Sequence, residues 1–277
     1  MPRRIDRIRT ANDEFQLAQA LLTNRRQRQR QRRFVVEGVR PINRLVEAGW
    51  PVDSIWFPAE RRLSAWAGAL LEATDVHVEV EPSLFAALSG KEEPSEVLVL
   101  AELPTDDLAR IRPGGDALLV AFDRPVSPGN LGSVIRSLDA FGGDGLVVTG
   151  HAADPYDPQS VRASMGSLFA VPTVRADSLD AVAEWLDTLR PALQVVATSV
   201  HAEAALEALD LTRPTLLALG NETRGLGQGW RELCDTVVRI PQRGGADSLN
   251  VAAAAAIALY EADRQRRAAG NPPGNGA

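Results

Sequence analysis

Short, almost uninterrupted apolar runs recur through the second half of the 277-residue chain, and they constrain its fold more than any other feature. The first, DALLVAFD at 116–123, lacks the polar alternation of a half-exposed strand and is typical of a strand buried on both faces. Four more runs follow, separated by helical segments, at 145–150, 193–199, 214–220 and 236–241. This alternation predicts an α/β domain with a parallel sheet and helices on both faces.

The first half of the chain alternates in the same way, with shorter elements. Residues 1–33 are expected to be helical and highly charged, and strands alternate with helices from RFVVEG at 33–38 to EVLVLAEL at 96–103. The polar stretch LPTDDLARIRPGG at 103–115 contains Pro and Gly and predicts a linker. The expected organisation is a small α/β domain at 1–104, a linker at 105–115, a second domain at 116–268 and a disordered tail at 269–277.

Charge is distributed unevenly along the chain. Residues 1–44 contain 12 arginines and four acids, a balance of +8, while the whole chain carries −6, so the remainder carries −14. A basic arm on an acidic body predicts contact with a polyanion such as a nucleic acid. The arginines expected to bind RNA are Arg25, Arg26, Arg28, Arg30, Arg32, Arg33 and Arg40.

Several other function classes are disfavoured. The single cysteine, Cys234, excludes a disulfide framework and fits a reducing cytoplasm. The three histidines lie far apart without partners at ligand spacing, so no metal site is expected. No apolar run reaches the roughly 18 residues that span a bilayer, so no membrane contact is expected. The absence of a dinucleotide-binding loop after the first strand of the sheet argues against a nucleotide-cofactor oxidoreductase with a Rossmann fold.

Three polar loops follow strands of the predicted parallel sheet, where ligands bind in such folds. The first, SPGNLGSVIRSLDAFG at 127–142, opens a helix that Asn130 is expected to cap. Val134, Leu138 and Phe141 are spaced to form the buried stripe of this helix, so Arg136 is expected to point away from the core.

The second and third loops combine glycines with polar side chains. LALGNETRGLG at 217–227 places Gly220 and Glu222 at the mouth of a buried strand, where glycine permits close backbone approach or a positive φ. IPQRGGADSLNVAAAAAIALYE at 240–261 runs into an alanine-rich helix that Asp247 or Ser248 is expected to cap.

In this order and spacing, the three loops resemble the motifs of the SpoU-type (TrmH-like) RNA 2′-O-ribose methyltransferases of the trefoil-knotted SPOUT superfamily. The resemblance spans nearly all of 117–261, and SVRASMGSLFAVPTVR at 160–175 is similar to the family's intermediate element. RRFVVEGVRPINRLVEAGW at 32–50 resembles the N-terminal substrate-binding domain often attached to this family, and this similarity fades at 89–103. The resemblance implies a C-terminal trefoil knot.

The resemblance also implies S-adenosylmethionine as the cofactor, gripped largely by backbone groups. The positions that carry over as cofactor-binding are Thr198, Leu219, Gly220, Asn221, Ile240, Ser248 and Leu249. The positions that carry over as catalytic are Asn130, Arg136, Glu222, Ser248 and Asn250. Arg136 matches the position proposed to activate the 2′-hydroxyl, but a free guanidinium stays protonated up to about pH 12. We therefore expect Arg136 to orient the hydroxyl and stabilise the developing alkoxide.

The implied partners are RNA and a second copy of the chain. A homodimer is expected because relatives complete the active site across subunits. The implied substrate is 23S rRNA, selected by residues 1–104. A tRNA substrate, or a non-catalytic RNA-binding protein with a methyltransferase-like body, remains the alternative. The sequence does not choose the nucleotide, or decide between ribosome maturation and antibiotic resistance.

Overall fold

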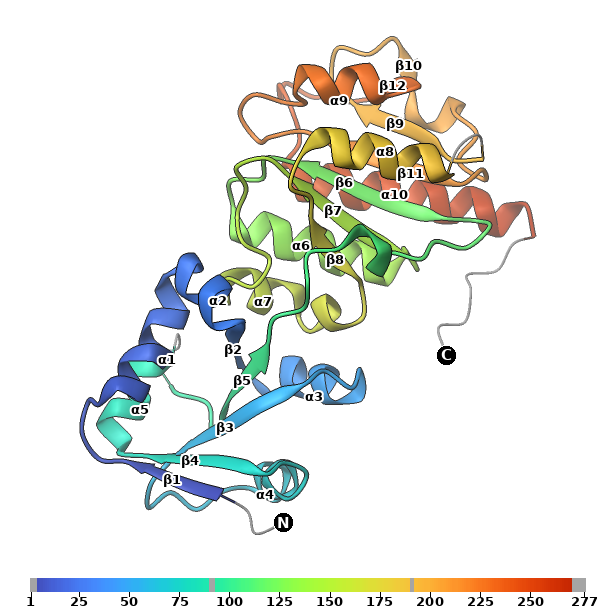
Figure 1. Ribbon diagram of the computed structural model, residues 1–277. Coiled ribbons are helices and arrows are strands. Elements are labelled where there is room, and N and C mark those ends of the chain that lie inside the picture. The colour runs from blue at the N-terminus through green and yellow to red at the C-terminus, as the bar shows by residue number, and fades with distance from the viewer. Residues whose placement is uncertain (1–3, 90–92, 190–191, 271–277) are drawn as a thin grey trace. The chain divides into compact units, whose positions relative to one another are not determined.

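The computed structural model describes residues 4–89, 93–189 and 192–270 (Figure 1). Contacts divide the chain into two compact units. Unit 1 consists of Met1–Pro104 and Tyr156–Phe169, and unit 2 consists of Thr105–Pro155 and Ala170–Ala277. The segment Tyr156–Phe169 thus departs from the expected organisation, which placed it in the second domain. Of the predicted tail, residues 271–277 lie outside the described residues.

Unit 1 is built on a five-stranded sheet with the order β1-β4-β3-β5-β2. Its strands are β1 (Arg4–Ile8), β2 (Arg33–Glu37), β3 (Val52–Pro58), β4 (Val76–Val80) and β5 (Leu98–Glu102). Its helices are α1 (Asp13–Thr23), α2 (Arg25–Gln31), α3 (Val39–Glu47), α4 (Ala65–Glu72), α5 (Pro82–Leu88), α7 (Pro158–Ser164) and the 3₁₀ turn η2 (Ser167–Phe169). Strands β1, β4 and β3 are parallel, and β5 runs antiparallel to β3 and β2.

The N-terminal residues correct one expectation. Residues 1–33 were expected to be helical, yet Arg4–Ile8 form an edge strand in parallel register with β4. Ile8 is buried and pairs with Val80. The hydrogen bonds that make this strand come from a partner about 70 residues away in sequence, so the local charge pattern does not reveal them.

An aromatic cluster explains why Tyr156–Phe169 belongs to unit 1. The ring of Tyr156 lies 4.9 Å from that of Phe34, and the ring of Phe169 lies 5.1 Å from that of Trp50. The indole N–H of Trp50 also donates to the carbonyl of Phe169 (3.1 Å). Aromatic pairs at such separations contribute beyond their buried area. These contacts hold the segment against β2 and the end of α3.

Unit 2 contains the predicted parallel sheet, with seven strands in the order β10-β12-β9-β11-β6-β7-β8. Its strands are β6 (Leu118–Asp123), β7 (Gly145–Thr149), β8 (Thr173–Arg175), β9 (Gln194–Thr198), β10 (Ala204–Ala205), β11 (Thr215–Leu219) and β12 (Thr236–Arg239). Its helices are α6 (Pro128–Ala140), α8 (Leu179–Leu189), α9 (Gln228–Leu233) and α10 (Val251–Ala268), with the 3₁₀ turns η1 (Leu108–Arg110) and η3 (Leu206–Ala208). Every neighbouring pair is parallel, as predicted.

Helices cover both faces of this sheet (Figure 1). On one face, Leu119 and Ala121 join a core cluster with Leu186 of α8 and Trp230 of α9. Since side chains alternate along a strand, Val120 points to the opposite face. There α10 packs against α6 and β11. The fold class is confirmed, and the sheet's carboxyl edge is left open for the loops.

Candidate active site

The loops singled out in the sequence meet at the carboxyl edge of the unit 2 sheet. Strands β12, β9, β11 and β6 are consecutive neighbours and all parallel, so the loops that follow them emerge at the same edge. Thr198 ends β9 and Leu219 ends β11, while Ile240 directly follows β12. The structure thus brings together three positions expected to line the cofactor pocket.

One carboxylate joins the loops that precede α6 and follow β11. Glu222 accepts from the backbone N–H groups of Val126 (2.9 Å) and Ser127 (3.1 Å). The side-chain amide of Asn130 donates to the same carboxylate (3.2 Å). The side-chain oxygen of Asn130 accepts from the amide of Asn250 (3.1 Å), which ties in the start of α10. Three of the five residues expected to be catalytic therefore form one network.

The surroundings of Glu222 favour its ionised form. Partial burial opposes ionisation and is the largest single influence on the group. The N–H groups of Val126 and Ser127 and the amide of Asn130 together outweigh it and hold the pKa of Glu222 below its usual value. At neutral pH the network therefore contains a carboxylate that only accepts hydrogen bonds.

The helix caps correct two expectations. Ser127, not Asn130, caps α6, with its hydroxyl accepting from the N–H of Asn130 (3.2 Å). Asn250, not Asp247 or Ser248, caps α10 and accepts from the N–H of Ala252 (2.9 Å). Pro128 fits the first position of α6 because that position needs no N–H donor, so the helix starts earlier than expected. This frees the Asn130 side chain for Glu222 and Asn250.

Close backbone approach explains Gly220. A Cβ on Gly220 would lie 2.3 Å from the nitrogen of Leu226 and 2.4 Å from the carbonyl carbon of Gly225. Asn221 and Gly225 exchange both backbone hydrogen bonds, which closes the turn beside this contact. The Asn221 side chain is engaged as well, since its amide donates to the carbonyl of Arg124 (2.8 Å). Asn221 thus holds the turn through its side chain.

These loops are supported by three residues that the sequence patterns did not indicate, namely Asp123, Arg124 and Thr149. Asp123 is buried and accepts from the N–H of Gly227 (2.9 Å) and the hydroxyl of Thr149 (3.2 Å). Arg124 donates to Asp123 (2.8 Å), and this hydrogen bond raises the pKa of the guanidinium. The indole of Trp230 donates to Thr149 (2.9 Å). The sequence does contain a signal for this cluster, because Asp123 ends a fully apolar run. A carboxylate buried at that place needs hydrogen-bond partners.

The loop between β12 and α10 presents an open set of backbone groups. Residues 241–248, including Ser248, are exposed, and Leu249 is half-buried. Within the described part of the chain, residues 240–249 form no hydrogen bond with one another or with other elements. Their N–H and carbonyl groups are therefore available to a ligand at the sheet edge. This donor and acceptor set fits adenine and an amino-acid carboxylate, both of which backbone amides recognise well.

Arg136 lies apart from the network. It is six residues beyond Asn130 on α6, which corresponds to about 9 Å along the helix axis. Its side chain is exposed, whereas Val134 and Leu138 are fully buried, as the spacing predicted. Phe141, the third expected member of the stripe, caps the helix and lies half-buried, with its ring 6.0 Å from that of Tyr260.

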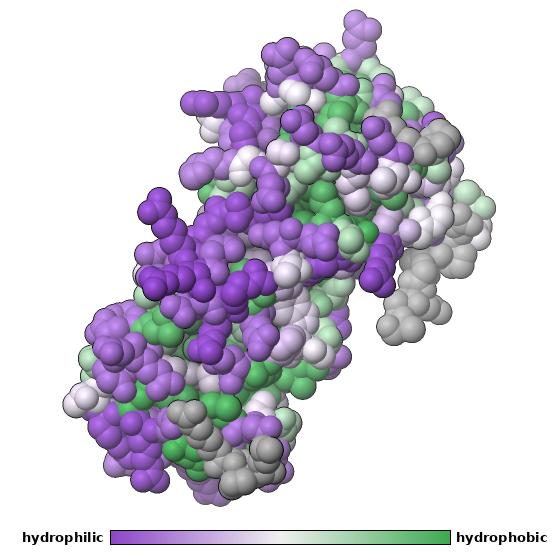
Figure 2. Space-filling model, viewed as in Figure 1, coloured by the Kyte–Doolittle hydropathy of each residue, from purple (hydrophilic) through white to green (hydrophobic). Residues whose placement is uncertain are grey.

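The arginines expected to bind RNA fall into three groups by exposure. Arg28 corrects one expectation: it is buried, and its guanidinium donates to the carbonyl of Leu21 (2.8 Å) and to Asp157 (3.3 Å). Other members engage protein groups while keeping some exposure, such as Arg33, which pairs with Asp53 at 2.8 Å. The members exposed to solvent are Arg26, Arg30, Arg32 and Arg40. Figure 2 shows hydrophilic side chains gathered over α1 and α2 on the face in view.

Across residues 4–89, 93–189 and 192–270, no three His, Cys, Asp or Glu side chains lie where they could hold a metal ion. Among the same residues, no helix has the length and apolar character needed to cross a membrane.

Comparisons with known proteins identify the family of the chain. Residues 117–260 match the model of the SpoU rRNA Methylase family, and residues 12–100 match the SpoU L30e-like domain. A 23S rRNA (uridine(2479)-2′-O)-methyltransferase from Streptomyces viridochromogenes is 50% identical over 265 residues, covering 94% of this chain and 92% of that protein.

Solved structures give the same picture. The SpoU methyltransferase AviRb from Streptomyces viridochromogenes, in complex with the cofactor AdoMet, aligns with a TM-score of 0.89 and 50% identity over 92% of this chain and 98% of that one. An AdoMet-bound rRNA methyltransferase from Sinorhizobium meliloti aligns with a TM-score of 0.82 and 31% identity over 94% and 98%.

Proposed function

The chain belongs to the SpoU rRNA methylase family and is an S-adenosylmethionine-dependent RNA 2′-O-methyltransferase, and we propose that it methylates one ribose of 23S rRNA. The observation that carries the proposal is the network of Glu222, Asn130 and Asn250, which joins the three motif loops. Similarity to the 23S rRNA methyltransferase from Streptomyces viridochromogenes, which aligns with 94% of the chain, supports 23S rRNA as the substrate.

The chemistry asks the protein mainly for alignment. S-adenosylmethionine, when bound, supplies a methyl group on a sulfonium. A ribose hydroxyl is a poor nucleophile, so holding its oxygen in line at near-attack distance lowers the barrier most. We assign this task to Arg136, whose exposed guanidinium is free of the helix core and can bind a phosphate next to the target ribose. Its charge also stabilises the alkoxide that develops as the hydroxyl proton is lost to water.

Asn130, Glu222 and Asn250 act in this proposal as positioning residues. Their mutual hydrogen bonds fix the start of α6, which carries Arg136, relative to the start of α10. The proposed site includes Ser248, because this residue is exposed and lies two positions before Asn250 at the start of α10. It can donate to substrate or cofactor because its hydroxyl has no partner among the described residues.

The cofactor pocket of the proposal lies at the ends of β9, β11 and β12. Backbone groups of Leu219, Gly220, Ile240 and Leu249 would hold the cofactor, with Thr198 beside them. Isothermal titration calorimetry with S-adenosylmethionine tests this pocket, and hydrogen exchange should show protection of residues 240–249 on binding. Binding that requires a divalent ion, or that leaves this loop unprotected, would contradict the pocket.

A homodimer is part of the proposal. On α10, Ala253, Ile257 and Tyr260 are exposed at the spacing of one helix face, with Ile257 40% and Tyr260 50% accessible. Val126, beside Glu222, is 66% exposed. A second copy that covers this apolar stripe would lie close to the site. Sedimentation velocity at micromolar concentration should show a dimer. Ile257→Asp should give monomers that have lost methyl transfer, and a fully active monomer would refute the homodimer.

The trefoil knot and the cytoplasmic location are also proposed. Family membership supports the knot, as does the path of the chain from β12, near one side of the sheet, to α10, which packs on β11 and α6. A ribosomal RNA substrate supports the proposed cytoplasmic location.

Methyl transfer to defined RNAs tests the function itself. Purified protein, S-adenosylmethionine and either unmodified 23S rRNA or bulk tRNA are incubated, and 2′-O-methylated nucleosides are measured by mass spectrometry. We expect one new methylated ribose in 23S rRNA, at the uridine that corresponds to the relative's target. Methylation of tRNA alone would refute the proposal that 23S rRNA is the substrate. Binding of cofactor and RNA without any methyl transfer would point to a non-catalytic RNA-binding protein.

A further inference from the structure

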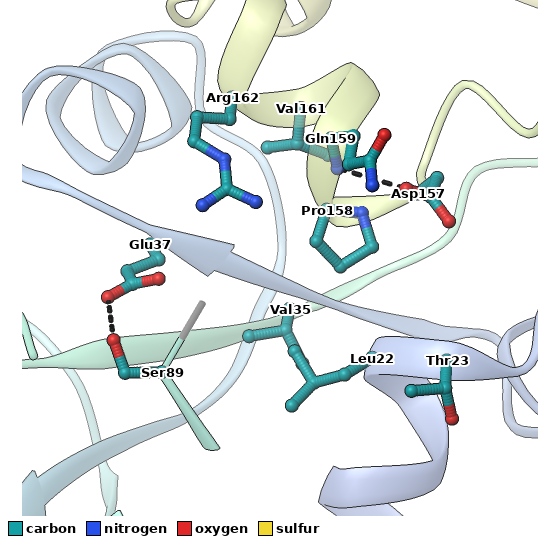
Figure 3. A pocket seen from close by; sticks show the side chains of 10 residues that line it. All are labelled: Leu22, Thr23, Val35, Glu37, Ser89, Asp157, Pro158, Gln159, Val161 and Arg162. Atoms are coloured by element: carbon teal, nitrogen blue, oxygen red, sulfur yellow. Dashed lines mark hydrogen bonds between the residues drawn. The ribbon is translucent and has the colours of Figure 1, made fainter. Parts of the chain in front are cut away.

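A cavity in unit 1, bounded by the end of α1, by β2 and by the start of α7, has carboxylates that are already engaged within the protein (Figure 3). Glu37 accepts from the hydroxyl of Ser89 (2.6 Å) and from the N–H of Ser95 (3.4 Å). Asp157 accepts from the buried Arg28 (3.3 Å). These carboxylates stabilise the fold of unit 1, whereas several charged side chains of unit 2 make no such contacts.

The arginines of unit 2 separate into engaged and unengaged groups. Most of those that the structure describes donate to carboxylates or backbone carbonyls, as Arg264 does to Glu261 (2.7 Å). Among the described residues, the arginines of unit 2 whose guanidinium groups make no hydrogen bond or ion pair are Arg112, Arg136, Arg213, Arg224 and Arg243. Arg112 and Arg213 precede β6 and β11, at the amino edge of the sheet, whereas Arg224 and Arg243 follow β11 and β12, at the carboxyl edge.

The positive charge at this edge contrasts with the charge of the whole unit. Unit 2 contains 14 arginines and 20 acidic residues, a balance of −6. An acidic surface repels RNA phosphates, so positive side chains are needed at the edge where the strand has to bind.

The neighbouring acids distinguish the two arginines of the carboxyl edge. Asp247 is exposed on the same loop as Arg243, so it offsets the charge of that arginine. Glu222 lies two positions before Arg224, but its carboxylate is turned toward the N–H groups of Val126 (2.9 Å) and Ser127 (3.1 Å). Arg224 is therefore the better candidate for contact with a ligand.

The backbone holds Arg224 in a fixed place. The side-chain oxygen of Asn221 accepts from the N–H groups of Thr223 (3.0 Å) and Arg224 (2.9 Å). Asn221 and Gly225 exchange both backbone hydrogen bonds (3.0 and 2.9 Å), and Gly225 has a φ of 64°. Because Glu222 on the same turn bonds to the segment before α6, the exposed side chain of Arg224 extends from a turn that is fixed relative to the start of α6.

We propose that the guanidinium of Arg224 binds a backbone phosphate of the RNA strand that carries the target ribose, an inference that rests on the proposed function. A planar guanidinium binds a phosphate through two parallel N–H bonds. Such a contact positions a strand without reading its sequence. The task differs from that of Arg136, because Arg224 determines how tightly the RNA is held, whereas Arg136 stabilises charge that develops during the reaction.

The cofactor is the other ligand with an anionic group at this edge, and its charge argues against it. S-adenosylmethionine has one carboxylate, but its sulfonium and ammonium groups give the molecule a net positive charge. A further cation beside it would oppose its binding. RNA carries a phosphate at every nucleotide, so an unpaired arginine suits the RNA better.

Steady-state methyl transfer to a 23S rRNA fragment, together with fluorescence-anisotropy binding across a salt series, tests the inference. Arg224→Ala should raise KM about fivefold and leave kcat within about twofold, since a phosphate contact is made equally in the ground state and the transition state. The slope of log Kd against log salt concentration should become smaller by about 0.7, as expected for the loss of one phosphate contact on a single strand.

Matched variants separate this contact from folding and general charge. Arg224→Lys keeps a positive charge and should restore the salt slope, but it should recover KM only in part because the bidentate geometry is lost. Arg112→Ala removes an exposed charge at the opposite edge of the same sheet and should behave like wild type. Melting temperature, sedimentation and cofactor affinity should be unchanged in all three variants.

An unchanged KM and salt slope in Arg224→Ala would overturn the inference, as would a lower kcat at normal KM, which indicates a role in the transition state. Loss of S-adenosylmethionine affinity would assign Arg224 to the cofactor carboxylate, and a changed oligomeric state would assign it to a subunit interface; either result also overturns the RNA contact. Failure of the proposed function is seen separately, as absence of methyl transfer to 23S rRNA by the wild-type protein, and it would remove this inference too.

Discussion

Replacing Glu222 by glutamine tests whether one carboxylate holds the loops of the active site together. The wild-type side chain accepts from the N–H groups of Val126 (2.9 Å) and Ser127 (3.1 Å) and from the amide of Asn130 (3.2 Å). Glutamine keeps one acceptor oxygen and turns an NH₂ group toward an N–H donor. At least one backbone bond is therefore replaced by a donor–donor contact.

The size of the effect follows from the exposure of the site. Hydrogen bonds to a charged acceptor contribute about 1.5–3 kcal/mol when buried. The Glu222 side chain is exposed, so water replaces part of each bond and the total loss should be about 1–2 kcal/mol. In a unit of this size that corresponds to a melting temperature lower by roughly 5 °C.

Thermal unfolding across a pH series gives the assay. Because the folded-state pKa of Glu222 is lowered, its contribution is fully present above the ordinary carboxyl pKa of about 4.3 and is lost as pH falls through the lowered value. Wild type and Glu222→Gln should therefore differ most at pH 6–7 and converge in acid, where the protonated carboxyl resembles the amide. Glu207→Gln, which removes an exposed charge from the same unit, should melt like wild type throughout.

The functional readout should follow stability. Methyl transfer should fall because the α6 start and its arginine lose their fixed position, while some cofactor affinity remains. Equal melting of the variant and wild type at pH 7, or a difference that persists unchanged into acid, would refute the role given to this network.

Four further substitutions probe other parts of the structure. Arg136→Ala should lower methyl transfer by about 10²-fold or more while calorimetry shows nearly unchanged cofactor affinity, and retained turnover would remove Arg136 from the mechanism. Gly220→Ala should cost about 1–3 kcal/mol and weaken cofactor binding, since its Cβ meets the nitrogen of Leu226 at 2.3 Å; normal melting and binding would show that the turn can shift freely. Arg28→Ala should destabilise unit 1 by about 3 kcal/mol in urea, because it leaves carbonyls and a carboxylate unpaired. Arg30→Ala should leave stability unchanged, weaken RNA binding and reduce the salt dependence of that binding. An equal loss of stability in Arg28→Ala and Arg30→Ala would contradict the structural role given to Arg28 and the RNA-binding role given to Arg30.

Much of unit 2 could be predicted because its signals are local. A strand buried on both faces needs an uninterrupted apolar run, and the helices between such runs direct neighbouring strands to be parallel. The position of Arg136 off the core followed from helix periodicity alone, as did the burial of Val134 and Leu138. The meeting of the three loops could be predicted because parallel strands end at a common edge of the sheet.

Other features depended on residues distant in sequence. Asn130 has the composition of a helix cap, but Ser127 takes that place because Pro128 fits the first helical turn, and Asn130 turns to Glu222 instead. Arg28 belongs to a run of arginines that looks uniformly exposed, yet the carbonyl of Leu21 and the carboxylate of Asp157, 129 residues away, bury it.

The amino-acid sequence by itself determined the parallel sheet, the glycine contact in the turn after β11 and the set of polar residues available to the site. Each of these follows from steric or hydrophobic properties of a few neighbouring residues. Tertiary structure alone decided that Tyr156–Phe169 joins unit 1, that Asp123 braces the loops and that Arg28 is structural. A buried charge or aromatic ring is stable only with partners, and those partners come from distant segments that local patterns cannot identify.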